Sequence, residues 1–327
     1  MSTHSSNASP ISGIWLPIVT PFLDGAIDFE SYERLLGYYL NQGISGIVPL
    51  GTTGEGPTIE PHEMEALIDL TVEVVDGRIP IYVGVGGNST RTVVQLVRRF
   101  ERFRFAGILS VCPYYNRPSE DGILEHFRSI AGSTDRNVLI YNIPYRTGVN
   151  LSNDAVLELA EVPNIVGIKD CCGNLTQTID LLRRRPPGFT VMTGEDALFY
   201  LALASGADGG ILASAHHRTR AFVEVFKRMR GNDHHTASRV WSTLEPNVRL
   251  LFREPNPTPM KHWLWRQGAL TSPECRLPLT RVSPALAGDL DKLESIGSHA
   301  YDNTRAPNGY AEHMESGAQL ARGLRLI

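Results

Sequence analysis

Short, nearly continuous apolar runs alternate eight times with longer amphipathic segments, and this alternation constrains the fold more than any other feature. The runs lack the apolar/polar alternation of half-exposed strands and are typical of strands buried on both faces of a parallel sheet. Helical spacing fills the segments between them, as in 29–40, 155–159 and 221–229. The predicted strands are Gly13–Phe22, Gly46–Gly51, Ile79–Gly86, Gly107–Pro113, Asn137–Pro144, Ile165–Asp170, Phe189–Gly194 and Gly209–Ser214.

Eight βα units predict an α/β fold of the (β/α)8 type, a TIM barrel, which usually takes about 250 residues. The alternative is a doubly wound open sheet, which would be expected to carry a glycine-rich dinucleotide turn after its first strand. Here the first apolar run leads into TPFLDG, and Gly84, Gly86 and Gly87 follow the third run without the required spacing. The barrel is therefore favoured, and these glycines indicate a tight turn.

The β-type runs stop near residue 231, so we expect a helical region to follow the barrel. Its two predicted helices, Thr236–Phe252 and Met260–Gln267, are separated by the proline-rich EPNPTP. Both chain ends are polar and aperiodic, which is typical of segments outside a packed core. The predicted divisions are an N-terminal extension (1–12), the catalytic barrel (13–231), a C-terminal helical domain (232–300) and a polar tail (301–327).

Charge and composition indicate which classes of binding partner this chain can have. A net charge of −4 and a pI near 6.2 give no electrostatic case for binding nucleic acid or an anionic membrane. The N-terminus lacks the pattern of a secretory signal, and no apolar run approaches the ~18 residues of a membrane span. We therefore expect a cytoplasmic protein with reduced thiols. No metal is expected, because the pairs His216–His217 and His234–His235 are adjacent and their side chains diverge.

Lys169 is the first candidate for chemistry. Only four of the 31 basic residues are lysines, so the chain uses arginine wherever a positive charge is enough. A lysine near the end of a buried apolar run therefore indicates a role that needs an amine. Burial disfavours the charged form, lowers the pKa of the amine and makes it a usable nucleophile toward a carbonyl, which a guanidinium cannot be. The alternative is a structural lysine paired with Asp170 or Glu195, and position alone does not decide between the two.

Other polar residues follow the predicted strands, where a barrel carries its active site. Tyr141 ends the neighbouring strand and could shuttle protons, with Thr52 and Tyr115 as a relay. Thr53 lies beside glycines and could bind a carboxylate, while Arg146 could grip a second carboxylate bidentately. Each also has a plainer interpretation, as a satisfied hydroxyl or an exposed arginine at the rim.

Six segments follow one another along the chain: GTTGEG, GRIPIYVGVGGNST, PYYNRPS, YNIPYRTG, GIKDCCGN and LFREPNPTPMKHW. Together they resemble the dihydrodipicolinate synthase and N-acetylneuraminate lyase family, and the resemblance covers roughly residues 13–300. The resemblance implies a homo-oligomer, usually a dimer of dimers, and a covalent lysine–pyruvate Schiff base in place of a bound cofactor. Lys169 would carry the Schiff base, Tyr141 would donate and accept protons, and Thr52 with a neighbouring subunit's Tyr115 would form the relay. Thr53, Ile211 and Gly194 would be substrate contacts.

Within this family, Arg146 matches the arginine with which the synthases hold the carboxylate of aspartate semialdehyde. The resemblance thus favours condensation of pyruvate with L-aspartate 4-semialdehyde to 4-hydroxy-tetrahydrodipicolinate, a step of lysine biosynthesis. Another keto-acid aldolase or dehydratase acting on a sugar acid is the alternative within the same chemistry. A catalytically silent binding protein is the alternative from a different class, and the intact set Lys169, Tyr141, Thr52 and Tyr115 argues against it.

Some positions depart from the family pattern. Tyr145 and the pair Cys171–Cys172 stand where small residues are usual, and they could reshape the pocket for the second substrate. The histidine and glutamate of lysine-sensitive synthases correspond to Pro61 or Met64 and to Thr92, although Asn88 and Tyr114 remain. We therefore expect weak or absent inhibition by lysine.

Overall fold

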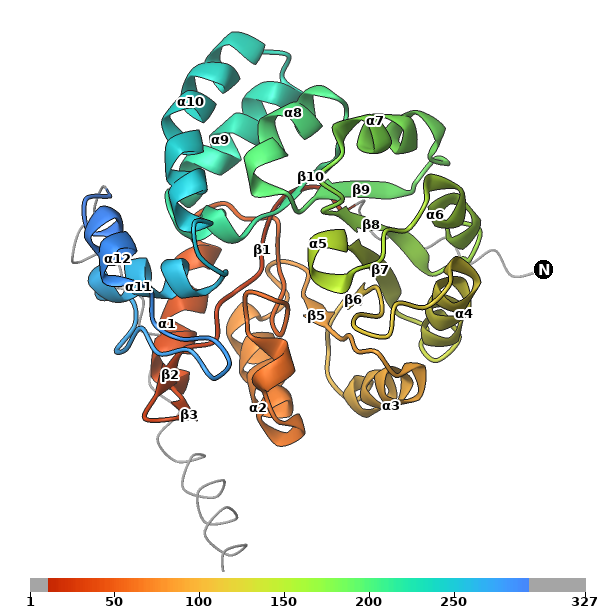
Figure 1. The fold of residues 1–327 in the computed structure, drawn as a ribbon, viewed down its shortest axis with the longest axis horizontal. Helices are drawn as coiled ribbons and strands as arrows, with labels where there is room; N and C mark the ends of the chain where they lie inside the picture. Colours follow the sequence, from red (N-terminus) through yellow and green to blue (C-terminus); the bar gives the residue numbers. More distant parts are fainter. Residues whose placement is uncertain (1–10, 294–327) are drawn as a thin grey trace, which may run out of the picture.

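The computed structural model describes residues 11–293, and their central feature is a parallel barrel ringed by helices (Figure 1). A backbone bridge between Ile47 and Ile81 joins the two edges of the sheet, so the sheet closes on itself. The predicted (β/α)8 fold is confirmed. The strand order is β4 (Gly46–Ile47), β1 (Gly13–Leu16), β10 (Gly209–Ile211), β9 (Thr190–Thr193), β8 (Ile165–Asp170), β7 (Asn137–Asn142), β6 (Gly107–Val111) and β5 (Tyr82–Gly84).

Helices cover the outside of the barrel. The helix Phe29–Leu40 has the predicted bounds, and Ser152 caps the next predicted helix by accepting from the Ala155 N–H. The helices of the ring are α1 (Phe29–Leu40), α2 (Pro61–Val75), α3 (Thr90–Phe100), α4 (Glu120–Ala131), α6 (Asn153–Leu159), α7 (Leu175–Arg184), α8 (Phe199–Ala204) and α9 (Thr219–Arg230).

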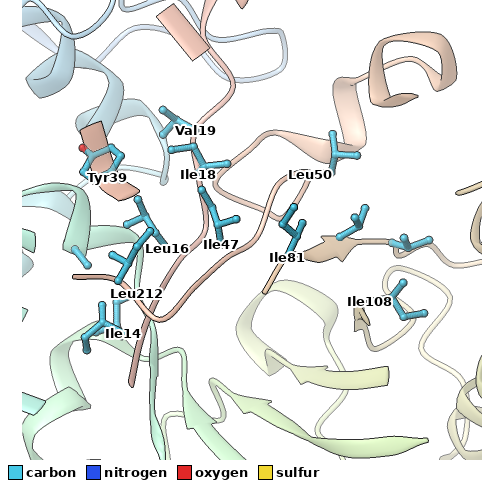
Figure 2. Close-up of a cluster of buried hydrophobic side chains, with 14 of the residues drawn as sticks. Ile14, Leu16, Ile18, Val19, Tyr39, Ile47, Leu50, Ile81, Ile108 and Leu212 are labelled. Carbon is cyan, nitrogen blue, oxygen red and sulfur yellow. The ribbon is translucent and has the colours of Figure 1, made fainter. Parts of the chain in front are cut away.

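Two apolar layers hold the barrel together. The inner layer fills the barrel, where the rings of Trp15 and Tyr82 form a T-shaped contact with their centroids 5.1 Å apart. Gly46 leaves room for Trp15, because a Cβ at Gly46 would lie 2.3 Å from its ring. The outer layer lies between strands and helices, as Figure 2 shows for Leu16 and Tyr39.

Three helices follow the barrel: α10 (His234–Leu251), α11 (Thr258–Arg266) and α12 (Pro284–Leu290). α10 packs along α9, whereas α11 and α12 lie near α1 and a small hairpin formed by β2 (Phe22–Leu23) and β3 (Ala26–Ile27) (Figure 1). No helix in residues 11–293 is both long and apolar enough to span a membrane. The predicted tail (301–327) and most of the predicted extension (1–12) lie outside the described residues.

Candidate active site at the carboxyl ends of the strands

Strand register brings the candidate amine and phenol together. Tyr141 on β7 pairs directly with Lys169 on β8, and Lys169 pairs in turn with Met192 on β9. Both polar residues lie near the carboxyl ends of their strands, where parallel barrels carry their active sites. The Lys169 Nζ lies 4.2 Å from the centroid of the Tyr141 ring. The neighbouring strands therefore place an amine against a phenol at the top of the barrel.

Lys169 is buried, with 6% of its surface exposed. Burial is the main influence that lowers the pKa of its amine, and the positive charge of Arg146 acts in the same direction. Asp196 and Glu195 oppose this shift through their negative charge. None of the ion pairs found within residues 11–293 involves Lys169, so the structural alternative, a salt bridge to Asp170 or Glu195, is not observed there. A buried, unpaired amine is suited to nucleophilic attack on a carbonyl.

Tyr141 is also buried, and burial raises the pKa of its phenol well above the ordinary value. A hydrogen bond with the Thr52 side chain and the charge of Arg146 act in the opposite direction. The phenol therefore stays protonated at neutral pH and keeps one hydroxyl partner. Such a group can pass a proton between the reacting atoms and Thr52.

Thr52 and Thr53 lie in the loop after β4. Thr53 is buried, and its hydroxyl oxygen accepts from the Asn256 amide at 3.0 Å. The Thr20 hydroxyl donates to the Gly54 carbonyl at 2.7 Å. These contacts hold the loop from two sides and leave Thr52 facing Tyr141.

Arg146 and Tyr145 stand at the rim, in the short helix α5 (Pro144–Thr147) that follows β7. Both side chains are exposed, and the Arg146 Cζ lies 5.6 Å from the centroid of the Tyr145 ring. The charge of Arg146 reaches both Lys169 and Tyr141. An exposed guanidinium above a buried amine can hold a substrate carboxylate while the rest of that substrate reaches the amine.

Gly194 and Ile211 complete the surroundings of Lys169. A Cβ at Gly194 would lie 2.3 Å from the Lys169 Cε and 2.4 Å from the Cys171 Sγ. Ile211 is buried in the inner layer, together with Tyr141 and Cys171. Gly194 therefore supplies the space that the lysine side chain occupies.

Tyr115 is the exception among the candidates. Its side chain is 88% exposed and its backbone is left-handed, with φ of 72°. Tyr115 thus buries little surface against its own chain. Within one chain the structure brings Lys169, Tyr141 and Thr52 together and leaves Tyr115 facing outward.

A cavity of about 290 Å³ lies beside the site and shares Thr52 and Tyr141 with it. Met64, Thr92, Asn88 and Tyr114, four of the five positions compared with the lysine site above, line it, whereas Pro61 does not. None of its lining residues carries a formal charge. The expected insensitivity to lysine stays a prediction, and an uncharged wall is consistent with it because charged groups are costly to desolvate. The lining residues are Leu50, Gly51, Thr52, Gly56, Pro57, Met64, Gly84, Val85, Gly86, Gly87, Asn88, Ser89, Thr92, Leu96, Phe100, Leu109, Val111, Tyr114 and Tyr141.

Sequence reasoning missed two polar residues close to the candidate site. Asp196 is buried, and burial raises the pKa of its carboxyl to about 6 although Ser214 donates to it through both N–H and hydroxyl. Asn256 reaches Thr53 from the helical region. The segments that contain them, TGED (Thr193–Asp196) and EPNPTP (Glu254–Pro259), do not indicate these contacts. Among residues 11–293, no group of three His, Cys, Asp or Glu side chains is arranged to hold a metal.

Comparison with known proteins agrees with this geometry. The model of the dihydrodipicolinate synthetase family matches residues 10–296. The chain belongs to the dihydrodipicolinate synthetase family. The resemblance found in the sequence motifs is thereby confirmed.

Individual members of the family are similar over most of their length. The 4-hydroxy-tetrahydrodipicolinate synthase 2 of Clostridium acetobutylicum is 47% identical over 283 residues, which cover 86% of this chain and 99% of the relative. The crystal structure of the dihydrodipicolinate synthase of Thermotoga maritima superposes with a TM-score of 0.84 at 36% identity, covering 86% of this chain and 97% of that one. The chloride-inhibited synthase of Acinetobacter baumannii, complexed with pyruvate, gives a TM-score of 0.84 at 34% identity, over 90% and 100% of the two chains.

Proposed function

We propose that this chain condenses pyruvate with L-aspartate 4-semialdehyde to give 4-hydroxy-tetrahydrodipicolinate, and so acts as a lyase of lysine biosynthesis. The observation that carries the proposal is the buried Lys169 amine, 4.2 Å from the Tyr141 ring and joined to no described carboxylate. The similarity to 4-hydroxy-tetrahydrodipicolinate synthases supports the choice of substrates.

In the proposed reaction, the neutral Lys169 amine attacks C2 of pyruvate and water leaves to give a Schiff base. Tyr141 passes the protons that this step needs, and Thr52 takes them onward. Loss of a proton from C3 gives an enamine, which attacks the aldehyde carbon of the semialdehyde. The amine of the second substrate then attacks C2, displaces Lys169 and closes the ring. No bound cofactor takes part, because the lysine itself activates the ketone.

Each remaining candidate has a part in binding. Thr53, Gly194 and Ile211 would line the pyruvate position, and Arg146 would hold the carboxylate of the semialdehyde. A guanidinium suits this task because it offers two parallel N–H donors to a carboxylate.

We further propose a cytoplasmic homo-oligomer, a dimer of dimers, in which Tyr115 completes the relay of a neighbouring subunit. The support is the 88% exposure of Tyr115, which leaves the relay incomplete within one chain. A tyrosine so exposed on a left-handed turn is available to insert into a partner.

A sugar-acid aldolase or dehydratase is the second candidate, because Tyr145 and Cys171 lie beside the site and could reshape the pocket for the second substrate. A coupled assay of pyruvate against a panel of aldehydes, including aspartate semialdehyde, separates the two. We expect aspartate semialdehyde to give the highest kcat/KM. A sugar aldehyde that outperforms it would overturn the choice of second substrate.

The substitution Arg146→Ala tests the same choice at the level of one residue. We expect kcat/KM for the semialdehyde to fall about 10- to 100-fold, the effect of losing a charge-assisted contact, while borohydride still traps pyruvate on Lys169. Arg183→Ala, which removes an exposed arginine paired with Asp180, is the matched control and should leave the rate unchanged. Equal semialdehyde activity in Arg146→Ala would contradict the assigned role.

A further inference from the structure

A buried ionic cluster joins the loop after β4 to the helical region that follows the barrel. The Lys261 Nζ on α11 donates to the Glu55 Oε1 at 2.6 Å, and the two side chains are 0% and 1% exposed. The other carboxylate oxygen of Glu55 accepts from the backbone N–H of Arg276 at 2.9 Å. We call Glu55, Lys261 and Arg276, together with the Phe22 ring that both cations approach, the Glu55 cluster.

The ring of Phe22 lies under both cations. The Lys261 Nζ is 4.2 Å from the ring centroid, and the Arg276 Cζ is 4.5 Å from it. Arg276 also pairs with both oxygens of Glu63, each at 2.6 Å, and donates to the Thr58 carbonyl at 3.0 Å. The cluster therefore anchors the loop at Glu55, at Thr58 and at the start of α2.

Glu55 is only two residues from Thr53, and its backbone is tied to the same turn. Its N–H donates to the Thr52 carbonyl at 3.1 Å. Its φ of 54° is left-handed, a conformation that a non-glycine residue keeps only when its surroundings hold it. Lys261 and Asn256 both belong to the helical region after the barrel. Their hydrogen bonds to Glu55 and Thr53 hold this turn from outside the barrel.

Burial makes the pair mutually dependent. A carboxylate and an ammonium removed from water lose their hydration, so each needs the other as a partner. A compact ammonium is suited to this fully enclosed position, whereas a guanidinium needs more space and more acceptors. This accounts for a lysine at position 261 in a chain that otherwise favours arginine.

We propose that Glu55 and Lys261 are positioning residues, whose ion pair fixes the turn that presents Thr52 and Thr53 to the substrate. The helical region after the barrel is then a part of the catalytic unit. The inference rests on the proposed function for the roles of Thr52 and Thr53, but the placement of the turn can be measured without any substrate.

The kinetic test uses Lys261→Met, Glu55→Gln and the double variant, at a temperature where all are folded. We expect each to raise the KM for pyruvate about 10-fold or more, while borohydride at saturating pyruvate still labels Lys169. Because the residues act as a pair, the double variant should be no worse than the poorer single variant. Lys292→Met, which removes an exposed lysine paired with Asp289, is the control and should keep the native KM. A native KM in folded Lys261→Met, or additive effects in the double variant, would overturn the proposal.

The structural test uses hydrogen exchange of the same proteins without substrate. The double variant buries no lone charge and is the one best able to fold. We expect faster exchange in 51–58 and unchanged exchange in β7 and β8. Unchanged exchange in 51–58 overturns the positioning role. If borohydride traps no pyruvate on the native protein, the proposed function is wrong. The exchange result then still shows whether the Glu55 cluster fixes the turn.

Discussion

Lys169 and Lys261 are two of four lysines in a chain with 31 basic residues, and both are buried. Their surroundings differ in one respect that decides their roles. Both amines lie 4.2 Å from the centroid of an aromatic ring, but Lys261 also has a carboxylate at 2.6 Å, whereas Lys169 belongs to no described ion pair. Burial lowers the pKa of both amines, and at Lys261 the charge and the hydrogen bond of Glu55 oppose that shift and favour the ammonium. One lysine is thus suited to react and the other to hold structure.

Asp196 offers a test of this account through pH. Its negative charge raises the pKa of Lys169, against the larger lowering by burial. In Asp196→Asn this attraction is lost, so Lys169 gives up its proton at lower pH. The acidic limb of pyruvate Schiff-base formation should move down by about one pH unit, the scale for removing one nearby charge.

The substitution Asp196→Asn keeps the acceptor oxygen for Ser214 and therefore its structural contacts. Asp289→Asn, at the surface, is the control and should leave the pH profile in place. The rate of borohydride-trapped adduct against pH gives the measurement. A limb that stays fixed or moves up in Asp196→Asn would show that the proton being lost does not belong to Lys169.

At the scale of elements, the apolar runs were enough to predict the eight strands of the barrel. Ile165–Asp170 has the predicted bounds, while Gly13–Phe22 shortens to Gly13–Leu16. Of the rest of that run only Phe22 enters a strand, β2, and the hairpin of β2 with β3 was not predicted. A hydrophobic run shows that its residues are buried, but it does not show whether they lie inside the barrel or between strands and helices. Here part of the run packs between strands and helices.

The sequence was enough to predict those parts of the candidate site that lie at the ends of neighbouring strands. Tyr141 and Lys169 end neighbouring strands, so their proximity followed from the fold. Asn256, Lys261 and Arg276 reach the loop after β4 from about 200 residues away along the chain. No periodicity links such distant segments, and this is why the Glu55 cluster emerged only from the structure.

Gly194, which follows β9, can be tested by substitution. Gly194→Ala would place a Cβ 2.3 Å from the Lys169 Cε, so the lysine side chain must shift. We expect the protein to fold, because the Lys169 side chain can move, and pyruvate trapping to slow by about 100-fold or more, since a misplaced catalytic group costs about that much.

Gly288→Ala in α12 is the matched control, since no atom lies within 4 Å of its added Cβ. Thermal unfolding and the trapping rate should be measured on both variants. Native trapping in Gly194→Ala would mean that Lys169 can react from another position.

At the scale of the whole molecule, Tyr115 links one barrel to the next. If a partner's Tyr115 completes each site, Lys169→Met and Tyr115→Phe subunits should complement each other. In a mixed dimer one site has both substitutions, and the other has native Lys169 with a native Tyr115 from its partner. Random mixing should restore about a quarter of the native activity, well above either parent protein.

Complementation requires subunit exchange, so the two proteins should be mixed after mild dissociation and their assembly followed by native mass spectrometry. A mixture of Lys169→Met with Lys169→Ala is the control and should stay inactive. Mixed oligomers without recovered activity would place the relay within one chain.

The central claim is that Lys169 reacts covalently with pyruvate, and one measurement tests it directly. The native protein is treated with pyruvate and borohydride, and its intact mass and its peptides are measured. The account predicts one reduced pyruvate adduct for each chain, located on Lys169 and absent from Lys169→Met. No adduct on the native protein, or an adduct on Lys227, Lys261 or Lys292 instead, would contradict it.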